Sequence, residues 1–80
     1  MDDFNQKRQQ MTDLTEKILE LFDERQALSR EIGSIKKRKG LPVEDPDREQ
    51  ELIEQLAKGS EQKEKLLKVL FAFSKEEQEE

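Results

Sequence analysis

The first half of the chain carries apolar residues at alternating steps of three and four. Between residues 3 and 39 there is no proline and a single glycine, Gly33. The apolar positions are Met11, Leu14, Ile18, Leu21, Leu28, Ile32 and Ile35. Such steps place side chains on one face of an α-helix, and with Arg25 filling the gap that face runs through about three and a half heptads. The pattern predicts one long helix over residues 3–39 whose apolar seam contains a cation.

Two shorter helices are expected after the long one. Gly40 and Pro42 end the first helix, and the cations at 36–39 suit the negative end of its dipole. Asp45 followed by Pro46 is typical of an N-cap and a first helical residue, so a second helix is expected over 46–58. Ser60 is expected to cap a third helix over 61–78, with the acidic residues 76–80 fraying. The apolar positions of these helices are Leu52, Ile53, Leu56, Leu66, Leu67, Val69, Leu70, Phe71 and Phe73.

The length of the first helix constrains the architecture. About 36 residues at ~1.5 Å each give roughly 54 Å, whereas a compact chain of 80 residues has a radius of gyration of roughly 12 Å. The two shorter helices cannot cover an apolar seam of that length. We therefore expect residues 1–80 to form one all-α domain of three helices, one long and two short. Two such chains are expected to form a homodimer through paired first helices.

Composition excludes several kinds of chemistry. Charged residues make up 44% of the chain and hydrophobic residues 31%, the net charge is −5, and there is no cysteine or histidine. The chain therefore lacks disulfides, thiolate metal sites and an imidazole general base. The negative charge argues against nucleic acid as the main partner, and no apolar run or signal-peptide pattern indicates a membrane or secretion. The expected location is the cytoplasm.

Cations on the seam of the first helix are the strongest functional signal. A buried guanidinium at Arg25 needs a partner, which is an internal glutamate, water reached by snorkelling, or a bound anion. Lys36 lies about 16 Å further along nearly the same face, so both cations can reach one anion, although a lysine at a helix end also suits the dipole. Arg8 lies roughly 100° around the helix from Arg25 and about 25 Å away. It reaches the same site only from a partner chain, and otherwise is a solvated arginine.

Acidic residues open the second helix. Glu49 lies in line with the apolar stripe, four residues after the Asp45 cap, and both also fit first-turn acids that complement the helix dipole. A calcium site made of Asp45, Asp47 and Glu49 is rejected, because Pro46 and Arg48 interrupt it and the spacing of an EF-hand is absent.

Two polar residues continue an apolar face of the third helix. Ser74 and Gln78 follow Leu66 and Leu70 at steps of four, so all four share one side of the helix. Polar side chains in such a position are unusual. The chain has no phosphate-binding glycine loop and no serine or cysteine nucleophile arrangement.

Taken in order, these residues resemble the all-helical class of chorismate mutases. The resemblance covers nearly the whole chain and is carried by Asp23-Glu24-Arg25, Ile32-Gly33-Ser34-Ile35-Lys36 and Gly40-Leu41-Pro42-Val43-Glu44-Asp45-Pro46-Asp47-Arg48-Glu49. It implies three helices per chain and an intertwined homodimer with two active sites. It also implies rearrangement of chorismate to prephenate in aromatic amino-acid biosynthesis, by a pericyclic shift that uses no metal or cofactor.

The resemblance implies a role for each of the cations. Arg8 of one chain and Arg25 of the other correspond to the arginines that hold the two carboxylates of chorismate. Lys36 corresponds to the lysine that contacts a carboxylate and the ether oxygen. Arg48 corresponds to a supporting arginine.

The resemblance also assigns the remaining walls of the site. Asp45 and Glu49 correspond to the positions that bind the ring hydroxyl, through backbone and side chain respectively. Ser74 and Gln78 correspond to the polar pair on the third helix, with the glutamine donating to the ether oxygen. The catalytic residues implied are therefore Arg25, Lys36 and Gln78.

Two alternatives remain open. An isochorismate pyruvate-lyase shares the fold and the placement of cations, although the connector over 40–49 resembles the mutases more closely. A non-catalytic helical dimerisation module would use the same seam, and Arg25 would then be only an unfavourable charge in it. Removing Arg25 would abolish activity in the enzymes and would leave the module's dimer unchanged or more stable.

Overall fold

The computed structural model describes residues 2–79, and Met1 and Glu80 lie outside the described residues. It consists of α1 (Asp2–Lys39), α2 (Pro46–Leu52), the short π-helix η1 (Ile53–Ala57) and α3 (Glu61–Glu79). Within residues 2–79 there is no strand, so the prediction of an all-helical chain with one long and two short helices is confirmed. The mostly acidic segment 76–79, which the sequence predicts to fray, continues α3 as helix.

Local sequence signals set the ends of the helices. The amide of Leu41 donates to the Lys36 carbonyl at 2.8 Å, and the amide of Gly40 donates to the Lys37 carbonyl at 3.3 Å. These bonds form a Schellman cap, in which Gly40 takes the left-handed conformation with φ +69°. The carboxylate of Asp45 accepts from the Arg48 amide at 3.1 Å and caps α2 as expected.

A local sequence signal also sets the start of α3. The hydroxyl of Ser60 accepts from the amide of Lys63 at 3.2 Å, which is the expected N-cap. The chain enters this cap through Lys58 and Gly59, whose φ angles of 48° and 83° turn it back from η1.

The second predicted helix, 46–58, differs from the structure in its second half. Its α-helical part ends at Leu52, and residues 53–57 form a π-helical turn. The wider turn carries Ala57, which is only 3% exposed. A π turn arises from tertiary packing and leaves no distinct spacing of apolar residues, so the sequence pattern does not distinguish it from an α-helix.

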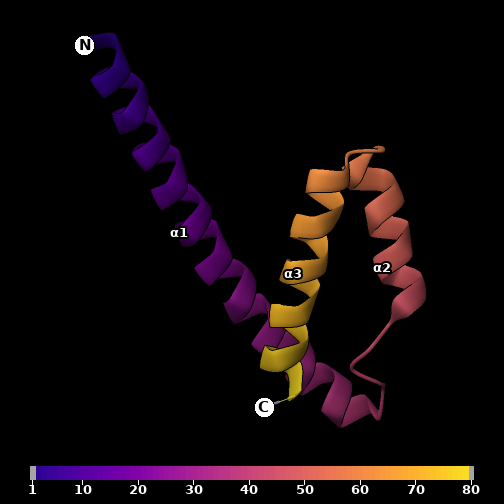
Figure 1. Cartoon of the computed structure of the whole chain (residues 1–80). Coiled ribbons are helices and arrows are strands. Elements are labelled where there is room, and N and C mark those ends of the chain that lie inside the picture. Colours follow the sequence, from indigo (N-terminus) through magenta and orange to yellow (C-terminus); the bar gives the residue numbers. More distant parts are fainter. Residues whose placement is uncertain (1, 80) are drawn as a thin grey trace.

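Helix α3 packs across the C-terminal half of α1, and α2 with η1 runs beside α3 (Figure 1). The face of α1 under α3 is made of small or polar residues, because Gln26, Ser29 and Gly33 are its buried positions. The rings of Phe22 and Phe73 meet edge to face with centroids 5.3 Å apart.

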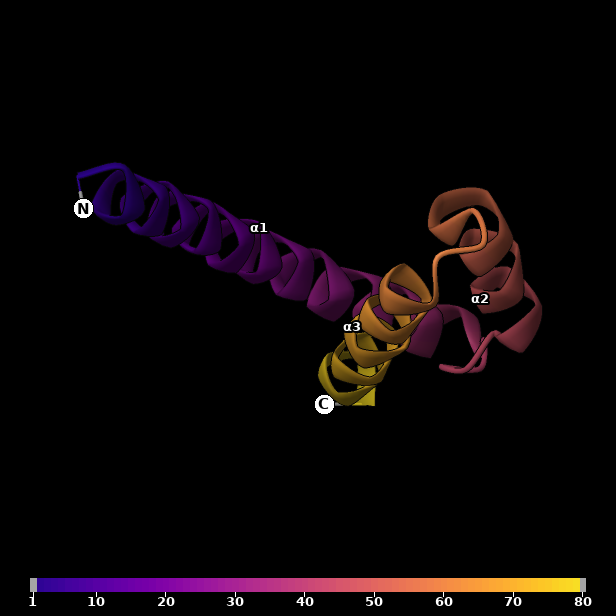
Figure 2. The same cartoon turned by 45° about the horizontal axis from the view of Figure 1, so that its top comes forward.

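The N-terminal half of α1 projects away from the other helices in both views (Figures 1 and 2). Its apolar seam is uncovered in the single chain: Met11 is 66% exposed, Ile18 62% and Leu21 63%. The longest dimension is 57 Å and the radius of gyration is 16.2 Å, well above the roughly 12 Å of a compact chain of this length. The predicted overhang of the first helix is therefore present.

Candidate active site

A cleft of about 500 Å³ opens where α1, the connector 40–45, α2 and α3 meet. It brings together every predicted site residue except Arg8, from segments that are far apart in the sequence. These are Arg25, Lys36, Asp45, Arg48, Glu49, Ser74 and Gln78. The apolar seam of α1 contributes Leu28 and Ile32 to the lining, so the seam changes from an uncovered stripe to one wall of the cleft as it passes under α3.

Arg25 is half-buried and turned toward α3. Its Nη1 donates to the Ser74 hydroxyl at 2.7 Å and to the Leu70 carbonyl at 3.3 Å. The cation that interrupts the seam is thus held by neutral oxygens of the third helix, in the wall of the cleft.

Lys36 joins α1 to the other end of the cleft. Its Nζ donates to the Gln78 Oε1 at 2.8 Å and to the Val43 carbonyl at 2.9 Å, so one ammonium group holds both the last turn of α3 and the connector. Because Gln78 accepts through Oε1, its Nε2 group is left to donate to a ligand.

Neither Arg25 nor Lys36 forms an ion pair with a carboxylate among residues 2–79. The internal glutamate that was one candidate partner for Arg25 is therefore absent from the described part of the chain. Two half-buried positive charges without a carboxylate partner give the inner part of the cleft an electrostatic character that suits an anion.

The wall formed by α2 carries both signs of charge. Asp45 uses Oδ1 to cap the helix, and Arg48 pairs with Glu51 at 3.3 Å across one turn, at the exposed rim. Glu49 is half-buried and has its side chain on the lining of the cleft. This wall can therefore accept hydrogen bonds from a ligand hydroxyl.

An ion pair between Lys75 and Glu44 fastens the connector to α3 beside the cleft. The hydrogen bond and the charge of Lys75 lower the pKa of the Glu44 carboxyl. The same contact raises the pKa of Lys75, with a smaller contribution from Glu79 at 4.0 Å. Both side chains are exposed, so the pair positions the connector more than it stabilises the fold.

Arg8 is the one predicted site residue that the single chain does not bring to the cleft. It is exposed on the projecting half of α1, and its guanidinium lies 5.5 Å from the ring centroid of Phe4. A straight helix separates it from Arg25, as the spacing of the two residues in the sequence requires.

Several lining residues were not predicted from the sequence. Ser29, Val43, Leu52, Phe71 and Lys75 complete the cleft. Ser29 carried a signal, since it lies with Gln26 and Gly33 at helical steps of three and four; such a stripe of small or polar residues marks a face where another helix approaches closely. The other four depend on how the connector and α3 fold back, which no local pattern encodes.

Two kinds of feature are absent from the described residues. Among residues 2–79, no three acidic side chains converge in a way that could hold a metal ion. Over the same range, no helix combines the length and the apolar composition needed to cross a membrane.

Comparisons with known proteins identify the family of the chain. The family model for chorismate mutase type II matches residues 7–79. A bifunctional chorismate mutase/prephenate dehydratase of Aquifex aeolicus is 36% identical over 56 residues, which are 70% of this chain and 16% of that protein. A chorismate mutase of Methanocaldococcus jannaschii is 33% identical over 51 residues, or 64% of this chain and 52% of that protein.

The chain thus spans about half of one curated relative and a small part of the other. No solved structure matches it with statistical significance. The family model nevertheless covers all the site residues named above, from Arg8 on the projecting half of α1 to Gln78 at the end of α3. The chain belongs to the chorismate mutase type II family.

Proposed function

We propose that the chain rearranges chorismate to prephenate in the cleft between α1, α2 and α3. The observation that carries this proposal is the pair of cations, Arg25 and Lys36, which are held only by neutral oxygens. The amide of Gln78 lies beside Lys36 and keeps its Nε2 group free to donate. Chorismate is a dianion whose ether oxygen gains negative charge as its bond to carbon breaks. A cleft with uncompensated positive charge and a neutral donor matches both features.

The proposed reaction requires that the substrate be held in position and that the charge developing on its ether oxygen be stabilised. The rearrangement is a pericyclic shift, so the protein transfers no proton and forms no covalent bond to the substrate. Arg25 would bind one carboxylate, and Lys36 would bind a carboxylate and the ether oxygen. Donors that are fixed before the reaction stabilise developing charge without reorganising, and in many enzymes this effect contributes most of the rate enhancement.

The α2 and α3 walls would orient the ring. Asp45 and Glu49 would accept from the ring hydroxyl, the first through its backbone and the second through its carboxylate, with Arg48 at the rim in support. Ser74 holds Arg25 in place, and Gln78 would donate from Nε2 to the ether oxygen.

The second carboxylate needs a further cation, and we propose Arg8 of a second copy of the chain. The uncovered seam on the projecting half of α1 supports such a homodimer. The chain exposes 6861 Å² of surface, roughly 1,800 Å² more than the about 5,000 Å² of a compact protein of its mass. Stable homodimers bury about 1,000–2,500 Å² per partner. Pairing of the first helices would therefore cover the excess and bring each Arg8 toward the other chain's cleft.

Incubation of the purified chain with chorismate tests the activity. We expect loss of chorismate absorbance and appearance of prephenate in equal amounts. A parallel incubation with isochorismate addresses the lyase alternative. Pyruvate from isochorismate, with chorismate left intact, would replace the proposal by that alternative, and turnover of neither substrate would leave a non-catalytic dimerisation module.

A further inference from the structure

The last turn of α3 holds a donor of the proposed site in an unfavourable place. Gln78 lies one residue before the end of the helix at Glu79. The carbonyl groups of a final turn have no partners within the helix, so such turns open easily. The Gln78 amide keeps its place beside Lys36 only if contacts outside the helix hold the turn.

Gly33 is the first of these contacts. A Cβ atom at this position would lie 2.7 Å from the Cα atom and 2.9 Å from the carbonyl oxygen of Gln78. Both are backbone atoms, so rotation of a side chain could not relieve the clash. Glycine inside a helix is less favourable than alanine, and here it permits direct contact between the backbone of α3 and α1 at residue 78.

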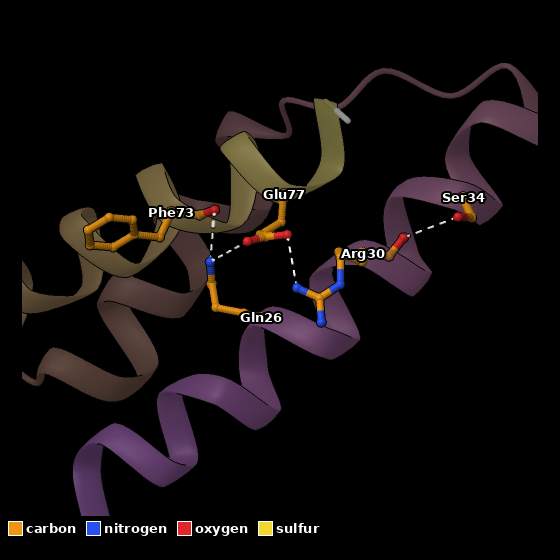
Figure 3. A network of polar contacts seen from close by, with 5 residues as sticks. All are labelled: Gln26, Arg30, Ser34, Phe73 and Glu77. Carbon is orange, nitrogen blue, oxygen red and sulfur yellow. Dashed lines mark hydrogen bonds and ion pairs between the residues drawn. The ribbon is translucent and has the colours of Figure 1, made fainter. Parts of the chain in front are cut away.

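Glu77 forms the second contact, on the neighbouring side of the same turn (Figure 3). Its Oε2 accepts from the Arg30 Nη1 at 3.1 Å, and its Oε1 accepts from the Gln26 Nε2 at 3.3 Å. Gln26 also donates to the Phe73 carbonyl at 3.5 Å, one turn earlier in α3. We call Gln26, Arg30 and Glu77 the clasp.

The orientation of Gln26 shows that the clasp is built around Glu77. Gln26 is 9% exposed, and its Oε1 is buried without a hydrogen-bond partner. The amide turns its donor toward the carboxylate and leaves its own acceptor unsatisfied, which is a costly arrangement inside a protein. The other charged member of the clasp, Arg30, binds the second oxygen of the same carboxylate.

We propose that Gly33 and Glu77 are positioning residues, which hold the last turn of α3 against α1 so that the Gln78 amide stays beside Lys36. This inference rests on the proposed function, in which Gln78 acts on the substrate. Neither Gly33 nor Glu77 lines the cleft, and each acts through the backbone of residue 78 or its neighbour.

The first test compares Glu77→Gln with Glu76→Gln. Both changes remove one negative charge from the same turn, but Glu76 is exposed and outside the clasp. We expect Glu77→Gln to lower kcat for chorismate about tenfold, because small displacements of a catalytic group cost large factors. KM should stay within about twofold, because Arg25 and Lys36 still bind the carboxylates. Equal rates in the two variants would overturn the assignment of Glu77.

Gly33→Ala tests the close contact and separates positioning from a general structural role. A positioning residue acts only through Gln78. When Gly33→Ala or Glu77→Gln is added to a chain that already carries Gln78→Ala, it should therefore cause no further loss of kcat. A general structural role would lower kcat by the same factor in the unmodified chain and in the Gln78→Ala chain, as independent effects do. Such additivity would overturn the proposal.

Hydrogen exchange gives a readout that does not depend on turnover. The backbone amides of residues 75–79 should exchange faster in Glu77→Gln than in Glu76→Gln, while the amides of α1 stay protected in both. Unchanged exchange at 75–79 would show that the clasp does not hold this turn. If the unmodified chain fails to turn over chorismate, the proposed function fails, and the exchange rates still decide whether the clasp holds the turn.

Discussion

Two cations of the cleft, Arg25 and Lys36, have neutral hydrogen-bond partners where an ordinary ion pair would use a carboxylate. Arg25 donates to a hydroxyl and a carbonyl, and Lys36 donates to an amide and a carbonyl. Neutral acceptors meet the hydrogen-bonding needs of the cations and leave their charges uncompensated. A carboxylate ligand can therefore replace weaker contacts, and the donors are already in place when it arrives.

Removal of either cation should abolish most of the activity. Arg25→Ala and Lys36→Ala are each expected to lower kcat/KM for chorismate by about a hundredfold or more, because a charge-stabilising donor is lost. Lys39→Ala is the matched control, since it removes an exposed cation at the same end of α1. Steady-state rates of chorismate loss measure all three. A rate retained in Arg25→Ala would show that Arg25 does not take part in the reaction.

Replacement of the amide at position 78 should create a pH dependence. The amide of Gln78 donates without titrating, so we expect the unmodified chain to show little change in rate between about pH 6 and 8. In Gln78→Glu only the protonated carboxyl can donate, and the nearby charge of Lys36 lowers the pKa of a carboxyl at this place. The activity of the variant should rise as the pH falls. A flat profile would show that residue 78 is not the donor to the ether oxygen.

At the scale of elements, the connector 40–45 is held from two sides. Its carbonyl at Val43 accepts from Lys36 of α1, and its carboxylate at Glu44 pairs with Lys75 of α3. The connector leads directly into Asp45, the cap of α2. The position of the α2 wall relative to the two cations therefore depends on contacts with both other helices.

The Glu44–Lys75 pair predicts a pH-dependent contribution to stability. The pKa of Glu44 is lowered, so its contribution is present above the ordinary carboxyl pKa of about 4 and is lost as the pH falls through the lowered value. The pKa of Lys75 is raised, so its contribution persists to about pH 10 and is lost above that. We expect Glu44→Gln to lower Tm slightly at pH 7 and by progressively less as the pH falls below about 4.

Thermal unfolding of the unmodified chain and of Glu44→Gln, at pH values from 7 down to 3, measures the difference in Tm. Glu20→Gln, an exposed acid in the middle of α1, controls for the loss of one charge. Because the pair is exposed, the difference should also disappear in about 1 M salt. A difference in Tm that does not shrink as the pH is lowered would assign the effect to packing of the side chain instead of the ion pair.

At the scale of the whole molecule, a single chain leaves much of the apolar seam of α1 exposed. The seam of α1 serves two purposes along its length: Leu28 and Ile32 line the cleft, and the stretch from Met11 to Leu21 is uncovered. The single chain likewise brings every predicted site residue to the cleft except Arg8, which is exposed near the N-terminus of α1. A second copy of the chain would resolve both features with a single interface.

Complementation between inactive variants tests this shared site. Arg8→Ala and Arg25→Ala dimers should each be nearly inactive. After mixing, unfolding and refolding, about half of the dimers are mixed, and each contains one site with both arginines intact, so about a quarter of the activity should return. Recovery of no activity, from variants that sedimentation shows to be dimeric, would place both arginines in the site of the same chain. An Arg8→Ala dimer that keeps its activity would place Arg8 outside the site.

Local patterns in the sequence determined the helices and most of the site. The steps of three and four fix α1, Gly40 and Asp45 end one helix and begin the next, and Arg25 is marked because packing disfavours a charge at its position. These signals work because they depend on helix geometry and on backbone hydrogen bonds within a few residues.

The tertiary structure alone decided the contacts between segments distant in sequence. It turned residues 53–57 into a π turn, placed α3 on Gln26, Ser29 and Gly33, and brought Glu77 to the clasp. No local rule relates residue 33 to residue 78, because that contact depends on the angle at which two helices cross. The sequence alone determined that Arg25 and Lys36 share a face of one helix, and tertiary packing decided which neutral groups hold them, because those groups come from α3 and the connector.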